Sequence, residues 1–280
     1  MTDYLKPIRG RSENAGMTLI GYLIISLAWT VGAGTFALVS AAAWGKNPEP
    51  WQAFVSSFGQ FIPILIAVIV AIYLFGRKPK TLITSRNKFS YRNLIVGMIS
   101  WGSILVLSSL LGWAANPDSL KFTFDLTTFI PALLVMILLM PIQVSAEEVF
   151  FRGYIPQTLS RTKISSGFVV VISSLLFALP HLLNPEAQAE PLWSLLAYSA
   201  MGFGWLVAAK WFGGLEIAIG AHFINNFFGL AIIGYENSVI APSSIWVGPA
   251  AQMQSAAIAL WVSVGIWLLI IKRFRARTTI

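Results

Sequence analysis

The sequence predicts an all-α, polytopic membrane protein of about eight transmembrane helices, with an intramembrane polar site on helices 4, 5 and 7. Of its 280 residues, 56% are hydrophobic and only 11% are charged, whereas about a quarter of the residues of an ordinary soluble domain are charged. Apolar stretches recur along the chain, each about as long as the 20 residues that an α-helix needs to cross a bilayer. Lipid-facing helices explain this composition, because a soluble protein needs polar side chains to cover its surface.

The apolar stretches are separated by short polar or Pro- and Gly-containing connections. In chain order, the predicted spans are 17–43, 53–75, 94–113, 128–155, 165–184, 192–211, 214–234 and 252–271. The first is much longer than the roughly 7 to 15 apolar residues of a signal peptide, which predicts a retained helix rather than a cleaved leader. No connection is long enough to hold a soluble domain, so residues 1–280 are interpreted as a single transmembrane domain.

The 19 Lys and Arg residues are distributed unequally between the two sides of the membrane. If the eight spans alternate, all of them except Lys46 and Lys121 fall on the side of the N-terminus. The opposite side carries carboxylates instead, namely Glu49, Asp118, Asp125, Glu186, Glu190 and Glu236. Because cytoplasmic loops carry the excess of basic residues, we predict a multi-pass protein with both termini in the cytoplasm, and we expect it in the bacterial inner (plasma) membrane.

The distribution of charge and the lack of cysteine exclude several functions. The formal net charge is +8, but nucleic-acid binding needs basic residues gathered on one soluble face, and here they lie between apolar runs. The chain has no cysteine, which excludes disulfides, a cysteine nucleophile and thiolate metal ligands. The first partner that we expect is the lipid bilayer, and no nucleic acid is expected.

Three predicted spans contain ionisable or amide side chains, which are costly inside a bilayer and therefore indicate a functional site. The fourth span contains Glu147, Glu148 and Arg152, the fifth contains Phe177 and His181, and the seventh contains His222 and Asn226. The two histidines are the only ones in the chain.

Helical spacing separates the two glutamates of the fourth span. Glu148 and Arg152 are four residues apart and share a helix face, so they can pair and offset the cost of burying each charge. Glu147 is rotated by about 100° from Glu148 and has no partner on its own helix. We therefore expect Glu147 to be the carboxylate that is free to act.

The polar side chains of the three spans also lie at similar depths. With a rise of about 1.5 Å per residue, Glu147, His181, His222 and Asn226 lie about 14 to 24 Å along their helices from the same membrane face. A lone buried ion pair can serve helix packing alone, but two histidines, an amide and an unpaired glutamate in one layer favour a functional site. Glu216, near the end of a span, is interpreted instead as a solvated charge at the interface.

This set of side chains fits hydrolysis of a peptide bond. A carboxylate in a site of low dielectric can act as a general base toward water, and histidine and amide groups are suitable donors to the oxyanion of a tetrahedral intermediate. The sequence lacks the G-x-S-x-G motif of many serine hydrolases and the zinc motif H-E-x-x-H, and its three Asp residues fall outside the spans. A glutamate-based mechanism remains.

The three polar segments read EEVFFR, FALPH and HFINN. They resemble the E-E-x-x-x-R, F-x-x-x-H and H-x-x-x-N/D motifs of the CPBP intramembrane proteases, a family that includes the type II CAAX prenyl endopeptidases and the bacteriocin-immunity (Abi) proteins. The motifs occur in the order of the family and span residues 147 to 226. The resemblance implies a protease-like core over residues 127–234 within an eight-helix chain.

The resemblance also implies a role for each catalytic residue. Carried over to this sequence, Glu147 and His181 activate the water molecule, while His222 and Asn226 line the oxyanion site. The reaction implied is hydrolysis of a peptide bond by an intramembrane glutamate endopeptidase.

The same resemblance implies supporting residues. Glu148 and Arg152 form the supporting pair, and Phe177 shapes the pocket. One Glu and two His are enough for a three-ligand zinc site with an open position, so a zinc-dependent form of the protease stays an alternative. We favour a site without metal and expect no cofactor.

The substrate that we expect is a membrane-bound or lipidated peptide or protein, of which a prenylated CAAX peptide is one form. Two other functions are compatible with the sequence. The first is a non-catalytic immunity or chaperone-like membrane factor that holds a partner helix. The second is a transporter or proton relay, since chains of intramembrane Glu and His also serve pumps. A transporter would favour inverted repeats and paired broken helices, and the sequence shows neither.

Overall fold

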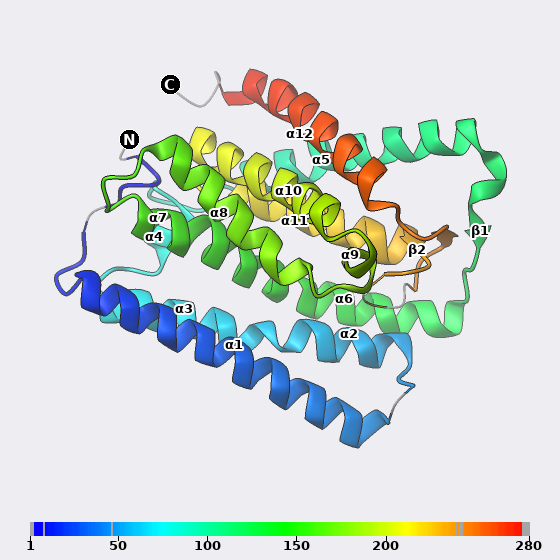
Figure 1. The fold of residues 1–280 in the computed structure, drawn as a ribbon, viewed down its shortest axis with the longest axis horizontal. Coiled ribbons are helices and arrows are strands. Elements are labelled where there is room, and N and C mark those ends of the chain that lie inside the picture. The colour runs from blue at the N-terminus through cyan, green and yellow to red at the C-terminus, as the bar shows by residue number, and fades with distance from the viewer. Residues whose placement is uncertain (1–2, 8, 46, 239, 241–242, 276–280) are drawn as a thin grey trace.

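A computed structural model of the protein describes residues 3–7, 9–45, 47–238, 240 and 243–275. Its helices form an elongated bundle with most axes roughly along the same direction (Figure 1). In that view α1, α2 and α3 lie along one side of the bundle and α12 and α5 along the other, with α6, α8, α10 and α11 between them. Two cations used to predict the orientation, Lys46 and Arg277, lie outside the described residues.

Within the described residues, six helical segments are long and apolar enough to cross a membrane. They are α1 (Ala15–Trp44), α2 (Pro50–Gly59) with α3 (Phe61–Leu74), α5 (Tyr91–Ala115), α6 (Leu126–Glu147) with η2 (Glu148–Tyr154) and α7 (Ile155–Leu159), α10 (Pro191–Phe212), and α12 (Met253–Arg275). Two apolar segments are shorter, namely α8 (Ser166–His181) and α11 (Glu216–Phe227) with η3 (Phe228–Ile232). The all-α, polytopic membrane class is confirmed, while eight spans stay a prediction.

The connections contain short elements that the sequence did not predict. They are α4 (Lys80–Ile83), η1 (Pro117–Ser119), α9 (Pro185–Ala189), and the strands β1 (Lys121–Phe122), β2 (Ile233–Tyr235) and β3 (Trp246–Gly248). The strands form a small sheet in the order β1-β3-β2, in which β1 is antiparallel and β2 parallel to β3. The predicted span 214–234 therefore ends too late, because the backbone becomes extended at Ile233.

The basic connections meet at one end of the bundle. Glu13, just before α1, lies 3.6 Å from Arg77 after α3 and 3.1 Å from Arg161 after α7. These pairs join the N-terminal segment to the loops that follow the second and fourth predicted spans. At the other end, Lys121 on β1 pairs with Glu236 at 2.8 Å. The connections that these ion pairs join thus lie at two different ends of the bundle.

The interpretation of Glu216 as a solvated charge is wrong. The side chain is fully buried, pairs with Arg86 at 2.6 Å and accepts a hydrogen bond from the backbone N–H of Ser90 at 3.0 Å. The connection between α4 and α5 folds back over the first turn of α11 and supplies both partners. A contact between segments so far apart in the chain leaves no local trace in the sequence.

Two glycines bring α5 and α11 close together. A Cβ at Gly97 would overlap the backbone carbonyl of Ile217, and a Cβ at Gly220 would overlap that of Leu94. Small residues of this kind let membrane helices approach at backbone distance. The close approach matters for function, because α11 carries His222.

We predict that Gly97→Leu lowers the free energy of unfolding by about 1–3 kcal/mol, because the larger side chain forces the two backbones apart. Thermal unfolding of the purified protein in detergent measures the effect. Gly112→Leu is the matched control, since Gly112 lies on the same helix with open space around its Cβ position. Equal stability of the two variants would contradict the packing role of Gly97.

Candidate active site

The candidate site begins where α6 changes into a π-helix. Glu147 is the last residue of α6, and Glu148 is the first of η2, a seven-residue π-helix whose residues are all buried. The backbone N–H of Glu148 still bonds to the carbonyls of Val144 and Ser145. Short π-helical segments occur frequently at functional sites. The change of helix type therefore falls between the two glutamates.

Glu148 forms the charged centre of the site. Arg152 Nη1 lies 3.1 Å from Glu148 Oε1, and His222 Nδ1 lies 2.8 Å from the same oxygen. Glu148, Arg152 and His222 are 0%, 1% and 3% exposed, respectively. An ionised carboxylate can only accept hydrogen bonds, so His222 donates from Nδ1 and turns Nε2 away from Glu148.

Aromatic rings enclose this charged centre. The Arg152 guanidinium lies 3.6 Å from the ring centroid of Phe177 on α8 and 5.0 Å from that of Trp205 on α10. The His222 ring stacks on Trp205 with a centroid distance of 4.5 Å. A cation over a desolvated ring face gains electrostatic stabilisation. Four helical segments thus hold Arg152 and His222 in place.

Glu147 has its nearest polar neighbour on another helix. Its Oε2 lies 3.5 Å from His222 Nε2 and has no hydrogen-bond partner among the described residues, and the residue is 7% exposed overall. The rotation away from Arg152 leaves Glu147 without a partner on its own helix. His222 therefore stands between the two glutamates, with one ring nitrogen toward each.

His181 ends α8 and presents one nitrogen to the site. Its Nδ1 lies 2.9 Å from the backbone carbonyl oxygen of Phe177. A carbonyl can only accept, so Nδ1 carries the proton and Nε2 is left as the acceptor. The ring is fixed by packing against Phe177, at 4.6 Å between centroids, and by stacking on Tyr198 at 4.2 Å.

Asn226 belongs to a chain of amide groups. Its Nδ2 donates to Gln143 Oε1 at 3.2 Å, and its Oδ1 accepts from Asn225 Nδ2 at 3.2 Å. Asn225 in turn accepts from the indole N–H of Trp101 at 3.1 Å. Sequence reasoning assigned no role to Gln143 or Asn225. A signal for Gln143 was present, because it lies four residues before Glu147 on an otherwise apolar helix.

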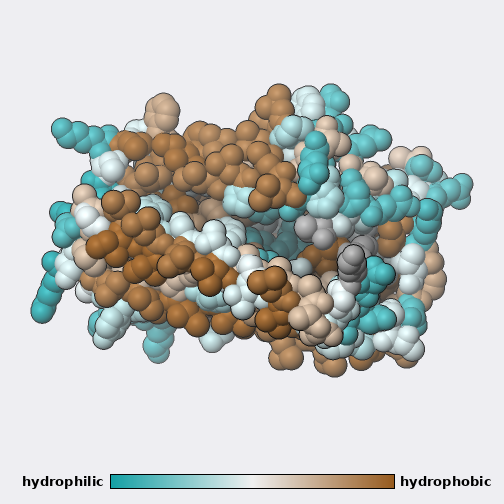
Figure 2. Space-filling model, turned by 60° about the horizontal axis from the view of Figure 1, so that its bottom comes forward, coloured by the Kyte–Doolittle hydropathy of each residue, from teal (hydrophilic) through white to brown (hydrophobic). Residues whose placement is uncertain are grey.

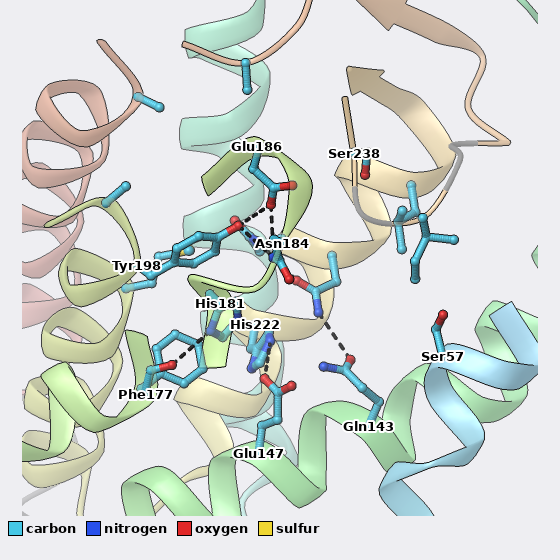
Figure 3. A pocket seen from close by; sticks show the side chains of 18 of the residues that line it. Ser57, Gln143, Glu147, Phe177, His181, Asn184, Glu186, Tyr198, His222 and Ser238 are labelled. Carbon is cyan, nitrogen blue, oxygen red and sulfur yellow. Dashed lines mark hydrogen bonds and ion pairs between the residues drawn. The ribbon is translucent and has the colours of Figure 1, made fainter. Parts of the chain in front are cut away.

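One cavity brings the four predicted catalytic residues together. It has a volume of about 420 Å³, and Glu147, His181, His222 and Asn226 all line it. Figure 3 shows the side chains of Glu147, His181 and His222 converging from three helices. Figure 2 shows that one face of the molecule is hollowed between apolar surfaces and that the floor of the hollow is hydrophilic. Of the supporting residues, Phe177 also lines the cavity.

The described residues do not form a ligand set for a metal ion. They contain no group of three His, Cys, Asp or Glu side chains placed to hold one. Both ring nitrogens of His222 face carboxylates, and His181 has only Nε2 left for a new partner. We therefore derive no step of the reaction through a metal.

The fold and the cavity define a polytopic membrane protein with a buried acid–histidine site. Residues 127–228 match the type II CAAX prenyl endopeptidase Rce1-like family. The chain is also 31% identical over 253 residues to the uncharacterized protein YyaK of Bacillus subtilis (strain 168), covering 85% of this chain and 84% of that protein. No solved structure matches the chain.

The chain belongs to the Rce1-like family of type II CAAX prenyl endopeptidases. This family supports a CAAX-type intramembrane protease at family level. The matched residues include all three motif segments that the sequence analysis singled out.

We predict that Arg152→Met lowers the free energy of unfolding by about 3–5 kcal/mol, because Glu148 would stay buried without its cation. The double variant Arg152→Met/Glu148→Gln should regain a large part of this loss, since it removes the stranded charge as well. Thermal unfolding in detergent of the two single variants and the double variant measures the coupling. Full stability of Arg152→Met would show that the pair does not hold the site together.

Proposed function

We propose that the protein is an intramembrane endopeptidase in which Glu147 and His181 activate the attacking water. Glu147 lines the cavity and its Oε2 has no hydrogen-bond partner among the described residues, while His181 lines the same cavity and has Nε2 left as an acceptor. Both are acceptors, which is what abstraction of a proton from water needs. The convergence of these two groups with His222 and Asn226 in one buried cavity carries the proposal.

We assign the oxyanion of the tetrahedral intermediate to His222 and Asn226. Asn226 has a second amide proton beyond the one given to Gln143. Nε2 of His222 lies 3.5 Å from Glu147 Oε2, so a proton taken from water by Glu147 is within reach of that nitrogen. Glu148 holds the ring through Nδ1 and orients Nε2 toward the cavity. The Asn226 donor is in place before the reaction, and Nε2 of His222 becomes the second donor when that proton reaches it; both then stabilise the developing charge.

The apolar surfaces around the cavity support a membrane-associated substrate. Apolar surfaces flank the hollow (Figure 2), and the lining itself is mostly apolar away from the polar residues named above. A peptide held in the bilayer, or carrying a lipid, meets such a surface without leaving the membrane. A prenylated CAAX peptide fits this description.

We predict that Glu147→Gln and His181→Ala each lower kcat for a quenched fluorescent membrane peptide by about 100-fold or more, because general-base catalysis contributes about that factor. Purified protein in detergent is assayed with and without a chelator. Glu190→Gln is the matched control, because Glu190 lies outside the cavity lining. Its carboxylate accepts a hydrogen bond from the backbone N–H of Gln254, which the amide oxygen of a glutamine can also accept.

Three outcomes of this assay would contradict the proposal. Full cleavage by folded Glu147→Gln and His181→Ala would remove the assigned roles. Loss of activity to chelator, restored by zinc, would make Glu147 and the histidines metal ligands instead. Absence of cleavage by the wild type would favour the non-catalytic immunity or chaperone-like function.

We also propose that both termini face the cytoplasm of a bacterial plasma membrane, as the distribution of basic residues indicates. The absence of cysteine permits a direct test. An impermeant maleimide should label Asp118→Cys in intact cells and Lys88→Cys only after permeabilisation, because the two exposed positions lie in connections at opposite ends of the bundle. The reverse pattern of labelling would invert the orientation.

A further inference from the structure

A second buried carboxylate lies at the far end of the active-site cavity. Glu186 on α9 lines the same cavity as Glu147 and is 2% exposed. In Figure 3 the two glutamates lie at opposite ends of the pocket, with His181 and Asn184 between them. The proposed hydrolysis makes no use of Glu186.

One oxygen of Glu186 is held by two hydrogen bonds and the other has none. Oε1 accepts hydrogen bonds from the Tyr198 hydroxyl at 2.5 Å and from Asn184 Nδ2 at 3.0 Å. Oε2 is buried without a hydrogen-bond partner among the described residues. Figure 3 shows this oxygen on the side of the carboxylate away from Tyr198. The geometry thus fixes the carboxylate and leaves its second oxygen buried without a donor among the described residues.

The neighbours of Glu186 are neutral. Tyr198 and Asn184 bring no charge, and burial together with Glu186 itself raises the pKa of Tyr235 to about 12, so Tyr235 also stays a neutral hydroxyl. The described residues that line the cavity include no Lys or Arg. Arg152, the buried cation behind the cavity, is paired with Glu148. No ion pair among the described residues includes Glu186, although a buried carboxylate is costly without a counter-charge.

We propose that Glu186 determines substrate specificity by receiving a cationic side chain, Lys or Arg, from the peptide that occupies the cavity. This inference rests on the proposed peptidase function. An ammonium or guanidinium group supplies both the missing hydrogen-bond donor and the missing positive charge. The same lining has no cation to receive a free C-terminal carboxylate, so the preferred peptide places a basic residue, rather than its C-terminus, at this end of the cavity.

A matched peptide series tests the specificity. Membrane-anchored fluorescent peptides carry Lys, norleucine or Glu at one position, scanned across both sides of the scissile bond, and kcat/KM is measured for each. At one position the wild type should prefer Lys over norleucine by about tenfold or more, the factor expected of a charge-assisted hydrogen bond, and should cleave the Glu peptide least. In Glu186→Gln the Lys-to-norleucine ratio should fall to about one.

Two further variants test whether a loss of the Lys preference comes from the missing carboxylate charge or from a disturbed structure. Glu190→Gln, at the start of α10 and outside the cavity lining, should keep the wild-type ratio. Tyr198→Phe removes one hydrogen bond to Oε1 and keeps the carboxylate, so it should retain the preference for Lys. Binding of the labelled peptides, followed by fluorescence anisotropy, gives the same ratio without cleavage.

The outcomes separate this inference from the proposed function. Cleavage without a preference for Lys at any position would overturn the role of Glu186 and leave the peptidase intact. Binding that favours Lys, depends on Glu186 and leads to no cleavage would support the cation site and contradict the peptidase. A wild-type Lys preference that persists in Glu186→Gln would assign the specificity to another residue and overturn the inference.

Discussion

Burial of ionised groups inside a helical bundle is the constraint on which the rest of the structure depends. Glu148 and Arg152 are almost completely removed from solvent, and desolvation of two charges costs several kcal/mol for each ion unless partners replace the lost water. The partners come from other helices: His222 bonds to Glu148, and the rings of Phe177 and Trp205 cover the guanidinium. The charged pair thus fixes where α8, α10 and α11 must lie.

The π-helix that carries this pair is itself supported from outside the membrane. The Tyr4 hydroxyl lies 3.2 Å from the backbone carbonyl of Arg152 and 2.6 Å from that of Leu82. Gln157 donates back to the Tyr4 carbonyl at 3.2 Å. Carbonyl groups that a change of helix type leaves poorly bonded need such partners. The N-terminal segment is therefore part of the framework of the site, although its sequence is polar and carries no motif.

The fold and the site differ in how far the sequence predicts them. Positions of the apolar helices follow from local transfer energies, which is why the predicted spans fall on helices. The convergence of Glu147, His181 and His222 followed from equal depth along neighbouring helices. The surroundings of Glu216 and Glu186 could not be predicted in this way. The partners of Glu216 come from a connection distant in the chain, and Glu186 lies on a short helix without an apolar pattern. The break at Glu148 was also not predictable, since an α-helix and a π-helix share the same composition.

The positions of the buried polar side chains disfavour the transporter or proton-relay function. A proton relay needs polar groups along the whole path between the two membrane faces, and here the polar lining of the cavity runs from Glu147 toward Glu186 on one side only. Between Arg152 and the N-terminal segment, the space is filled by packed aromatic rings. Tyr154 stacks there against Phe75 and Phe150. Arg152 itself is held by Glu148 and two ring faces, so it is poorly placed to pass a proton onward. A cavity that reaches one face of the molecule and ends at a fixed ion pair suits the binding and hydrolysis of a substrate better than conduction.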